Sequence, residues 1–201
     1  RALDAVQLGA RTFDGVDALV MSAYSLVDGS QRDYAVTALA LANEARVPTF
    51  VDMGTGAVNA LRGRLIDVVR KVDYLLMNER ELFTLTGKDN ISEAVAGLSG
   101  HGIEQLILKV GEMGSIVVTP ERSELVDPYE VEGVIDTTGA GDVFTAAFAH
   151  AIVSGEDLLG AARIGNVAGA LATTAVGAQS RVIDADTLRS EARVFEKSSR
   201  S

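Results

Sequence analysis

The sequence predicts an α/β fold built around a mainly parallel sheet. Short apolar stretches of strand type alternate with longer segments whose apolar residues recur at helical spacing. Repeated strand–helix–strand units imply a parallel sheet with helices on both faces. With 201 residues and 47% hydrophobic residues, the chain is large enough to bury a substantial core. We therefore expect a single α/β domain over residues 1–201, with a frayed polar tail at 197–201.

The first part of the chain alternates strands and helices. Ser30 is a candidate cap for a helix, and Asn78 is a candidate cap for another helix that ends near Gly87. We expect strands at 18–23, 47–52 and 74–77, and helices at 31–45, 57–70, 78–87 and 92–98.

The second part begins with two strands and ends with long helices. Gly111-Glu112-Met113-Gly114 joins strands at 105–110 and 115–119, and a turn-rich passage follows through Pro120 and Pro128. We expect helices at 141–153, 158–175 and 185–196. Ligands of such sheets bind outside the carboxyl ends of the strands, and the motifs described below lie at strand ends or helix starts.

Composition excludes several classes of function. The formal net charge of −10 argues against general nucleic-acid binding, which requires clustered Lys and Arg. No uncharged apolar run reaches membrane-spanning length, so we expect no membrane partner. The sequence has no cysteine, and its two isolated histidines, His101 and His150, do not form a zinc site. We expect both histidines at the surface and the protein in the cytoplasm.

The stretch Ile-Asp-Thr-Thr-Gly-Ala-Gly-Asp-Val-Phe at 135–144 is the most informative in the chain. Its small residues Gly139, Ala140 and Gly141 leave backbone N–H groups uncovered where a long apolar helix begins. A helix start directs unpaired donors and partial positive charge toward an anion such as phosphate. Asp142 follows in a position to accept a proton from an attacking hydroxyl. A plain tight turn with Asp142 as a helix cap uses the same residues, so the motif alone leaves both interpretations open.

Residues Asp136 to Asp142 resemble the C-terminal signature of the ribokinase-like (PfkB) carbohydrate kinase family, D-T-T-G-A-G-D followed by an apolar helix. The resemblance extends from about residue 15 to residue 180. It implies a ribokinase-like three-layer sandwich and ATP-dependent phosphoryl transfer to a hydroxyl of a sugar or polyol. It also implies that Asp142 is the catalytic base and that Gly139, Ala140 and Gly141 stabilise the transferring group.

Two further motifs support the resemblance. Asn78 and Glu81 match the family's N-x-x-E motif, which organises Mg²⁺ and the phosphates through waters; a capping box needs the same pair. The segment from Lys109 to Gly114 resembles the strand–turn segment that approaches the nucleotide, and Gly111 and Gly114 also suit a plain hairpin. Lys109 stands where the family often has Thr, and it either adds charge to a phosphate or faces solvent.

The remaining candidates follow from the family. Asn166 matches a small polar residue beside adenine, although a helical Asn is often merely exposed, and Thr138 is a further candidate for nucleotide binding. Gly177 is interpreted first as a helix cap. In the family a segment similar to Gly177-Ala178-Gln179-Ser180 lines a monovalent-cation site together with the residue at Asp136, which implies K⁺ as a possible cofactor beside ATP and Mg²⁺.

The sequence also departs from the family. Family members carry a further N-terminal portion with a Gly-Gly sugar-binding motif and a small β-sheet lid that mediates homodimerisation, and we expect both to be absent here. Asp52-Met53-Gly54 replaces the Asp-Pro-Asn that often follows the corresponding strand, which puts a role for Asp52 in doubt. The chain has no P-loop and no G-x-S-x-G motif.

Three functional hypotheses follow. The first is a carbohydrate kinase, or its nucleotide-binding and catalytic portion, with a nucleoside kinase on the same scaffold as the alternative enzyme. The second is a truncated kinase that binds nucleotide or sugar without catalysis. The third is a generic α/β domain whose motifs coincide with the family by chance. Nucleotide binding separates the third hypothesis from the others, and phosphoryl transfer separates the first from the second.

Overall fold

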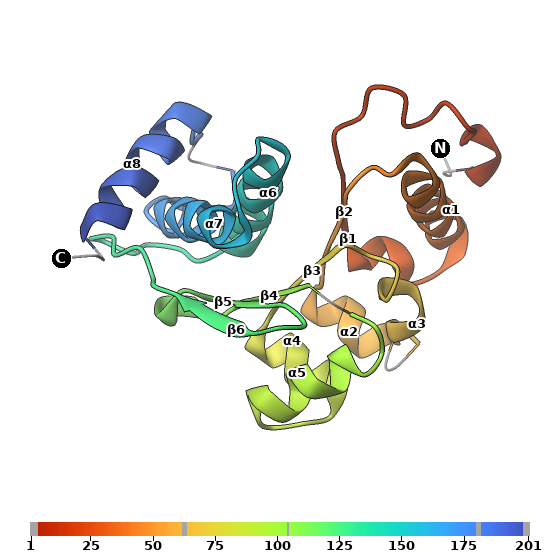
Figure 1. Cartoon of the computed structure of the whole chain (residues 1–201), viewed down its shortest axis with the longest axis horizontal. Coiled ribbons are helices and arrows are strands. Elements are labelled where there is room, and N and C mark those ends of the chain that lie inside the picture. Colours follow the sequence, from red (N-terminus) through yellow and green to blue (C-terminus); the bar gives the residue numbers. More distant parts are fainter. Residues whose placement is uncertain (1–3, 62–63, 104, 180–181, 199–201) are drawn as a thin grey trace. The chain divides into compact units, whose positions relative to one another are not determined.

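The computed structural model describes residues 4–61, 64–103, 105–179 and 182–198 (Figure 1). Its strands form a six-stranded sheet in the order β1-β2-β3-β4-β5-β6. The strands are β1 (Leu19–Ser22), β2 (Thr49–Asp52), β3 (Tyr74–Asn78), β4 (Leu106–Lys109), β5 (Ser115–Val118) and β6 (Ser123–Val126). The alternation of strands and helices confirms the predicted α/β class.

The helices include eight of α type among the described residues. They are α1 (Gly29–Ala45), α2 (Thr55–Leu61), α3 (Ile66–Val69), α4 (Glu79–Thr86), α5 (Ile91–Ser99), α6 (Ala140–Val153), α7 (Leu158–Ala172) and α8 (Ala185–Ser198). Three 3₁₀ turns, Ala5–Gln7, Ala23–Leu26 and Gly111–Met113, complete the elements. Across the ranges the structure describes, no helix combines the length and the apolarity needed to cross a bilayer.

The chain separates into two compact units. The first contains Arg1–Leu108 and Val118–Arg122, and the second contains Lys109–Val117 and Ser123–Ser201. We describe each unit by itself. The prediction of a single domain stays a prediction, and residues 199–201 of the predicted tail lie outside the described residues.

The first unit is built from parallel strands with helical crossovers. Strand β1 pairs with β2, and β2 pairs with β3, both in parallel, with Asp52 opposite Leu76. Parallel neighbours need a crossover, which α1 supplies between β1 and β2 and which α2 and α3 supply between β2 and β3 (Figure 1). All four residues of β2 are buried, as expected of an interior parallel strand.

The second unit is built on two apolar helices. Helices α6 and α7 lie side by side and make the most extensive contact between any two described elements (Figure 1). Phe144 of α6 lies against Gly165 of α7, where a Cβ atom would be 2.8 Å from the ring. Glycine at this position therefore allows the two helices to approach closely.

Several element boundaries differ from the prediction. Helix α1 begins after Asp28, so Ser30 lies inside the helix and is not its cap. The helix predicted at 57–70 is two helices, α2 and α3. Helix α7 ends at Ala172 and Thr173 is its C-terminal cap, so Gly177 is not. Strand β6 was not predicted, because its sequence Ser-Glu-Leu-Val has little apolar character and lies in the turn-rich passage.

Candidate active site

The start of helix α6 is fixed by a glycine in the left-handed conformation. Gly139 has φ 81° and stands immediately before Ala140, the first residue of α6. A Cβ atom on Gly139 would lie 2.6 Å from the Cβ of Ala178, which is too close for any real side chain. Both the backbone angle and the neighbouring chain therefore require glycine here.

This helix start presents backbone donors beside Asp142. The first bond inside α6 runs from the Val143 N–H to the Gly139 carbonyl, at 2.9 Å. The N–H of Ala140 donates to the Thr137 carbonyl at 3.2 Å, so this predicted donor already has an acceptor. The N–H groups of Gly141 and Asp142 precede the first intrahelical bond and have no acceptor within the helix. The Asp142 side chain is exposed in the same turn.

Lys109 lies against this turn. Its ammonium donates to the Gly141 carbonyl at 3.5 Å and to the Thr145 hydroxyl at 3.4 Å, both within the second unit. A Cβ atom on Gly141 would lie 3.3 Å from the Lys109 Nζ, so the absence of a side chain at Gly141 makes room for the ammonium. The structure therefore brings Lys109 and the Gly-Ala-Gly-Asp turn together, although they are about thirty residues apart.

Asp136 ties the approach to this turn to the segment after α7. Its Oδ1 accepts from the Thr138 N–H at 2.9 Å, and its Oδ2 accepts from the Gly177 N–H at 2.8 Å. Hydrogen bonding from the Thr138 side chain, followed by the N–H groups of Thr138 and Gly177, holds the pKa of Asp136 below its ordinary value. Ser180, in the segment predicted to line a cation site, lies outside the described residues.

Gly114 and Asn166 meet at the segment that leaves β6. Gly114 has φ 88°, and a Cβ atom there would collide with the Val126 carbonyl and lie 2.7 Å from the Pro128 nitrogen. The Asn166 amide donates to the carbonyls of Val126, at 3.1 Å, and Asp127, at 2.9 Å. Asn166 is buried, so its amide anchors this segment rather than facing solvent. Gly111, with φ 62°, opens the turn that Gly114 closes.

In the first unit, Asn78 and Glu81 form the capping box that the sequence allowed. The Asn78 Oδ1 accepts from the Glu81 N–H at 2.9 Å, and the Glu81 Oε2 accepts from the Asn78 N–H at 3.0 Å. The Glu81 Oε1 also accepts from the Thr55 hydroxyl at 3.2 Å. Thr55 was not predicted as a site residue, because it belongs to a different strand-end loop and nothing in its local sequence marks it.

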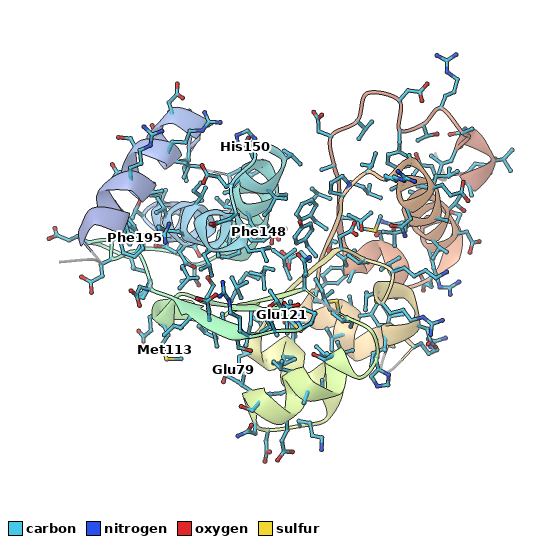
Figure 2. All side chains as sticks on the ribbon, in the orientation of Figure 1. Glu79, Met113, Glu121, Phe148, His150 and Phe195 are labelled. Carbon is cyan, nitrogen blue, oxygen red and sulfur yellow. The ribbon has the colours of Figure 1, made fainter. Side chains whose placement is uncertain are left out.

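The donor set here fits a hydrated cation rather than a closed metal cage. Within the ranges the structure describes, no cluster of three or more His, Cys, Asp or Glu side chains could hold a metal ion. Asn78 and Glu81 supply hard oxygen atoms, and Mg²⁺ commonly uses one or two protein ligands together with waters and phosphate. Both histidines are exposed, as predicted, and His150 lies on α6 (Figure 2).

The comparison with protein families decides the family of this chain. The model described as "pfkB family carbohydrate kinase" matches residues 5–185. The chain belongs to the pfkB family of carbohydrate kinases. This confirms the resemblance inferred from residues 136–142, and the match covers both compact units.

Individual members of the pfkB family show how much of a full protein the chain represents. The chain is 39% identical to a ribokinase of Arabidopsis thaliana over 119 residues, 56% of this chain and 30% of that protein. It is 34% identical to a deoxyribokinase of Salmonella typhi over 126 residues, 60% of this chain and 41% of that protein. The chain therefore matches less than half of the length of either relative.

Solved structures support the pfkB fold. A candidate ribokinase II from E. coli, solved with ATP and Mg²⁺, superimposes with a TM-score of 0.83. The alignment covers 96% of this chain and 63% of that chain, at 22% identity. The predicted ribokinase-like fold is thus confirmed at a level of identity at which function does not follow from structure alone.

Proposed function

We propose that this chain is the nucleotide-binding and catalytic portion of an ATP-dependent kinase that phosphorylates a hydroxyl of a sugar or related polyol. Membership of the pfkB family supports the reaction class. The observation that carries the proposal is the start of α6, where the exposed Asp142 follows N–H groups that have no acceptor within the helix. A proton acceptor and anion-stabilising donors in one turn suit phosphoryl transfer.

In this proposal Asp142 accepts the proton of the acceptor hydroxyl. The hydroxyl oxygen forms a bond to the γ-phosphorus of ATP while the bond from that phosphorus to the bridging oxygen breaks, and ADP leaves. The N–H groups of Gly141 and Asp142, with the turn set by Gly139 and Ala140, stabilise charge on the transferring group. Phosphoryl transfer depends more on such positioning and electrostatics than on early deprotonation.

We assign the nucleotide to residues of the second unit. Lys109 supplies positive charge beside the Gly141 turn, and Gly111, Gly114 and Thr138 are the further candidates for contact with the nucleotide; of these, Gly111 has open space where a Cβ would lie. Asn166 has both donor contacts on backbone carbonyls, so any contact with adenine falls to its Oδ1, which would accept a hydrogen bond from an amino group.

We assign the ions to two separate places. In the first unit, Asn78 and Glu81 would hold hydrated Mg²⁺, and the ion would supply positive charge. Asp136 would contribute to a K⁺ site beside the Gly177 segment. A cytoplasmic location and a homodimer formed through the family's lid stay predictions.

The test is ADP release from Mg-ATP by the protein, measured with a panel of sugars, sugar acids and nucleosides. Turnover on one acceptor supports the kinase and identifies its substrate class; a nucleoside acceptor replaces the sugar in the proposal. Binding of Mg-ATP without turnover on any acceptor favours a non-catalytic module. Failure to bind any nucleotide contradicts both.

A further inference from the structure

The carboxylate of Glu81 is held from two different segments of the first unit. Its side chain belongs to a residue only 5% exposed, in the first turn of α4. One oxygen, Oε2, accepts from the Asn78 N–H within the capping box. The other oxygen, Oε1, accepts from Thr55, which is 26 residues earlier in the chain. A capping box needs only the first of these contacts, so the Thr55 contact requires its own explanation.

The pairing of β2 with β3 brings Thr55 to this position. Asp52 of β2 is opposite Leu76 of β3, and the Met53 N–H continues the pairing by donating to the Leu76 carbonyl at 2.8 Å. The carboxyl ends of the two strands therefore lie together. Thr55, which begins α2, consequently lies beside Glu81, which is in the first turn of α4, just after β3.

Tyr24 contacts the start of α2, which carries Thr55. Its hydroxyl accepts from the Gly56 N–H at 3.1 Å. A Cβ atom on Gly54 would collide with the Tyr24 ring, and one on Gly56 would lie 2.5 Å from the Tyr24 hydroxyl oxygen. With the Tyr24 ring in this position, neither of the two glycines that flank Thr55 has room for a side chain.

We propose that Thr55 is a positioning residue for Glu81 and that Tyr24 holds Thr55 in place. Thr55 fixes one carboxylate oxygen, so that the orientation of the Glu81 carboxylate is set before a cation arrives. This inference rests on the proposed role of Glu81 toward Mg²⁺. Removal of a residue that orients a metal ligand through a hydrogen bond commonly lowers metal affinity by about 10- to 100-fold. The segment Asp52-Met53-Gly54 departs from the family's Asp-Pro-Asn. In this proposal its role is to lead from β2 to Thr55, the residue that orients Glu81.

The test compares three substitutions by isothermal titration of ATP at a series of Mg²⁺ concentrations and in EDTA. Thr55→Val removes the hydroxyl at nearly constant volume, and Thr55→Ser keeps it. Thr84→Val is the control, because Thr84 lies in α4, the same helix as Glu81. Its hydroxyl donates within that helix, to the Arg80 carbonyl at 2.8 Å. Thermal unfolding without ligand checks that each variant is folded.

We expect Thr55→Val to raise the Mg²⁺ concentration needed for half-maximal ATP binding by roughly tenfold, without changing ATP affinity in EDTA. Thr55→Ser should restore the wild-type Mg²⁺ dependence, and Thr84→Val should leave it unchanged. An unchanged Mg²⁺ dependence in Thr55→Val, or an equal loss of affinity with and without Mg²⁺, overturns the inference and leaves Thr55 a structural contact.

Glu81→Gln distinguishes this failure from failure of the proposed function. If Glu81→Gln raises the Mg²⁺ concentration needed for half-maximal ATP binding and Thr55→Val does not, only the positioning role of Thr55 is wrong. If the wild-type protein binds ATP equally well with Mg²⁺ and with EDTA, or if Glu81→Gln has no effect, the assignment of Glu81 to Mg²⁺ fails and the positioning role fails with it.

Discussion

At the scale of single residues, the side chains and glycines around the start of α6 have separable tasks. Gly139 allows the turn, Lys109 places an ammonium against it, and Asp142 remains exposed at its edge. The contacts of Lys109 with Gly141 and Thr145 hold its ammonium beside the start of α6. Removal of this positive charge should therefore weaken binding of an anion there. Removal of the Asp142 carboxylate should instead disturb proton transfer.

Asp142→Asn should therefore lower kcat by about 10²- to 10⁴-fold, because a neutral amide of the same shape cannot accept the hydroxyl proton. ATP affinity should change little, since the backbone donors are untouched. Steady-state ADP release and direct titration of ATP measure the two effects. The control is Asp186→Asn, which neutralises an exposed acidic residue in the first turn of α8. Retention of turnover in Asp142→Asn would show that another group is the base.

Asp136 gives a pH-dependent prediction. The folded-state pKa of Asp136 is lowered, so its contribution to the free energy of unfolding is fully present above the ordinary value of about 3.9. That contribution is lost as the pH falls through the lowered pKa, because the protonated carboxyl no longer accepts both N–H bonds. NMR titration of the Asp136 carboxyl should show a midpoint below the ordinary value of an aspartate carboxyl, and Asp136→Asn should reduce the acid dependence of unfolding. An Asp136 midpoint at or above the ordinary value contradicts this account.

At the scale of elements, the sequence predicted those whose own residues specify them. Helices α4, α6 and α8 begin within a residue or two of their predicted starts, because caps, apolar spacing and small residues act locally. Strand β6 was missed because only four residues form it and just one of them, Val126, is buried. Its position depends on pairing with β5, and on the turn in which the Thr119 N–H donates to the Arg122 carbonyl.

The same distinction between local and long-range contacts applies to the candidate site. Asn78 and Glu81 were recognisable because their contact spans three residues. The contacts of Thr55 with Glu81 and of Tyr24 with Gly56 span 26 and 32 residues, and they depend on strand pairing that brings distant segments together. Asn166 was recognised as a polar residue in a helix, but its backbone acceptors at Val126 and Asp127 could not be predicted without β6.

Two glycine substitutions should have opposite effects on stability, because Gly165 lies at the contact between α6 and α7 and Gly97 lies in open space on α5. Gly165→Ala would place a Cβ atom 2.8 to 3.0 Å from the Phe144 ring, and such overpacking should lower the free energy of unfolding by about 1–3 kcal/mol. In Gly97→Ala, in α5, the new Cβ atom meets nothing within 4 Å. This substitution should raise the free energy of unfolding by about 0.5–1 kcal/mol, because alanine has the higher helix propensity. Denaturant unfolding measures both. Equal effects of the two variants would mean that Phe144 moves aside at little cost.

At the scale of the whole molecule, net charge constrains how an anionic ligand can bind. A formal charge of −10 opposes general attraction of polyanions, so ATP must be held by local groups such as backbone donors and Lys109. The chain matches only 30% of the length of the Arabidopsis ribokinase and 41% of the Salmonella deoxyribokinase. Acceptor specificity is therefore a property to measure on the protein rather than to transfer from either relative.

Stabilisation by nucleotide tests this whole-molecule argument. Mg-ATP at about 100 times its Kd should raise the free energy of unfolding by about 2.7 kcal/mol, which corresponds to roughly 5–10 °C in Tm for a chain of this size. Inorganic tripolyphosphate with Mg²⁺ offers comparable negative charge without adenosine, and an acidic protein should gain much less from it. Calorimetry with each ligand makes the comparison. Equal stabilisation by both would show that phosphate charge alone is recognised, and it would remove the adenosine contact assigned to Asn166.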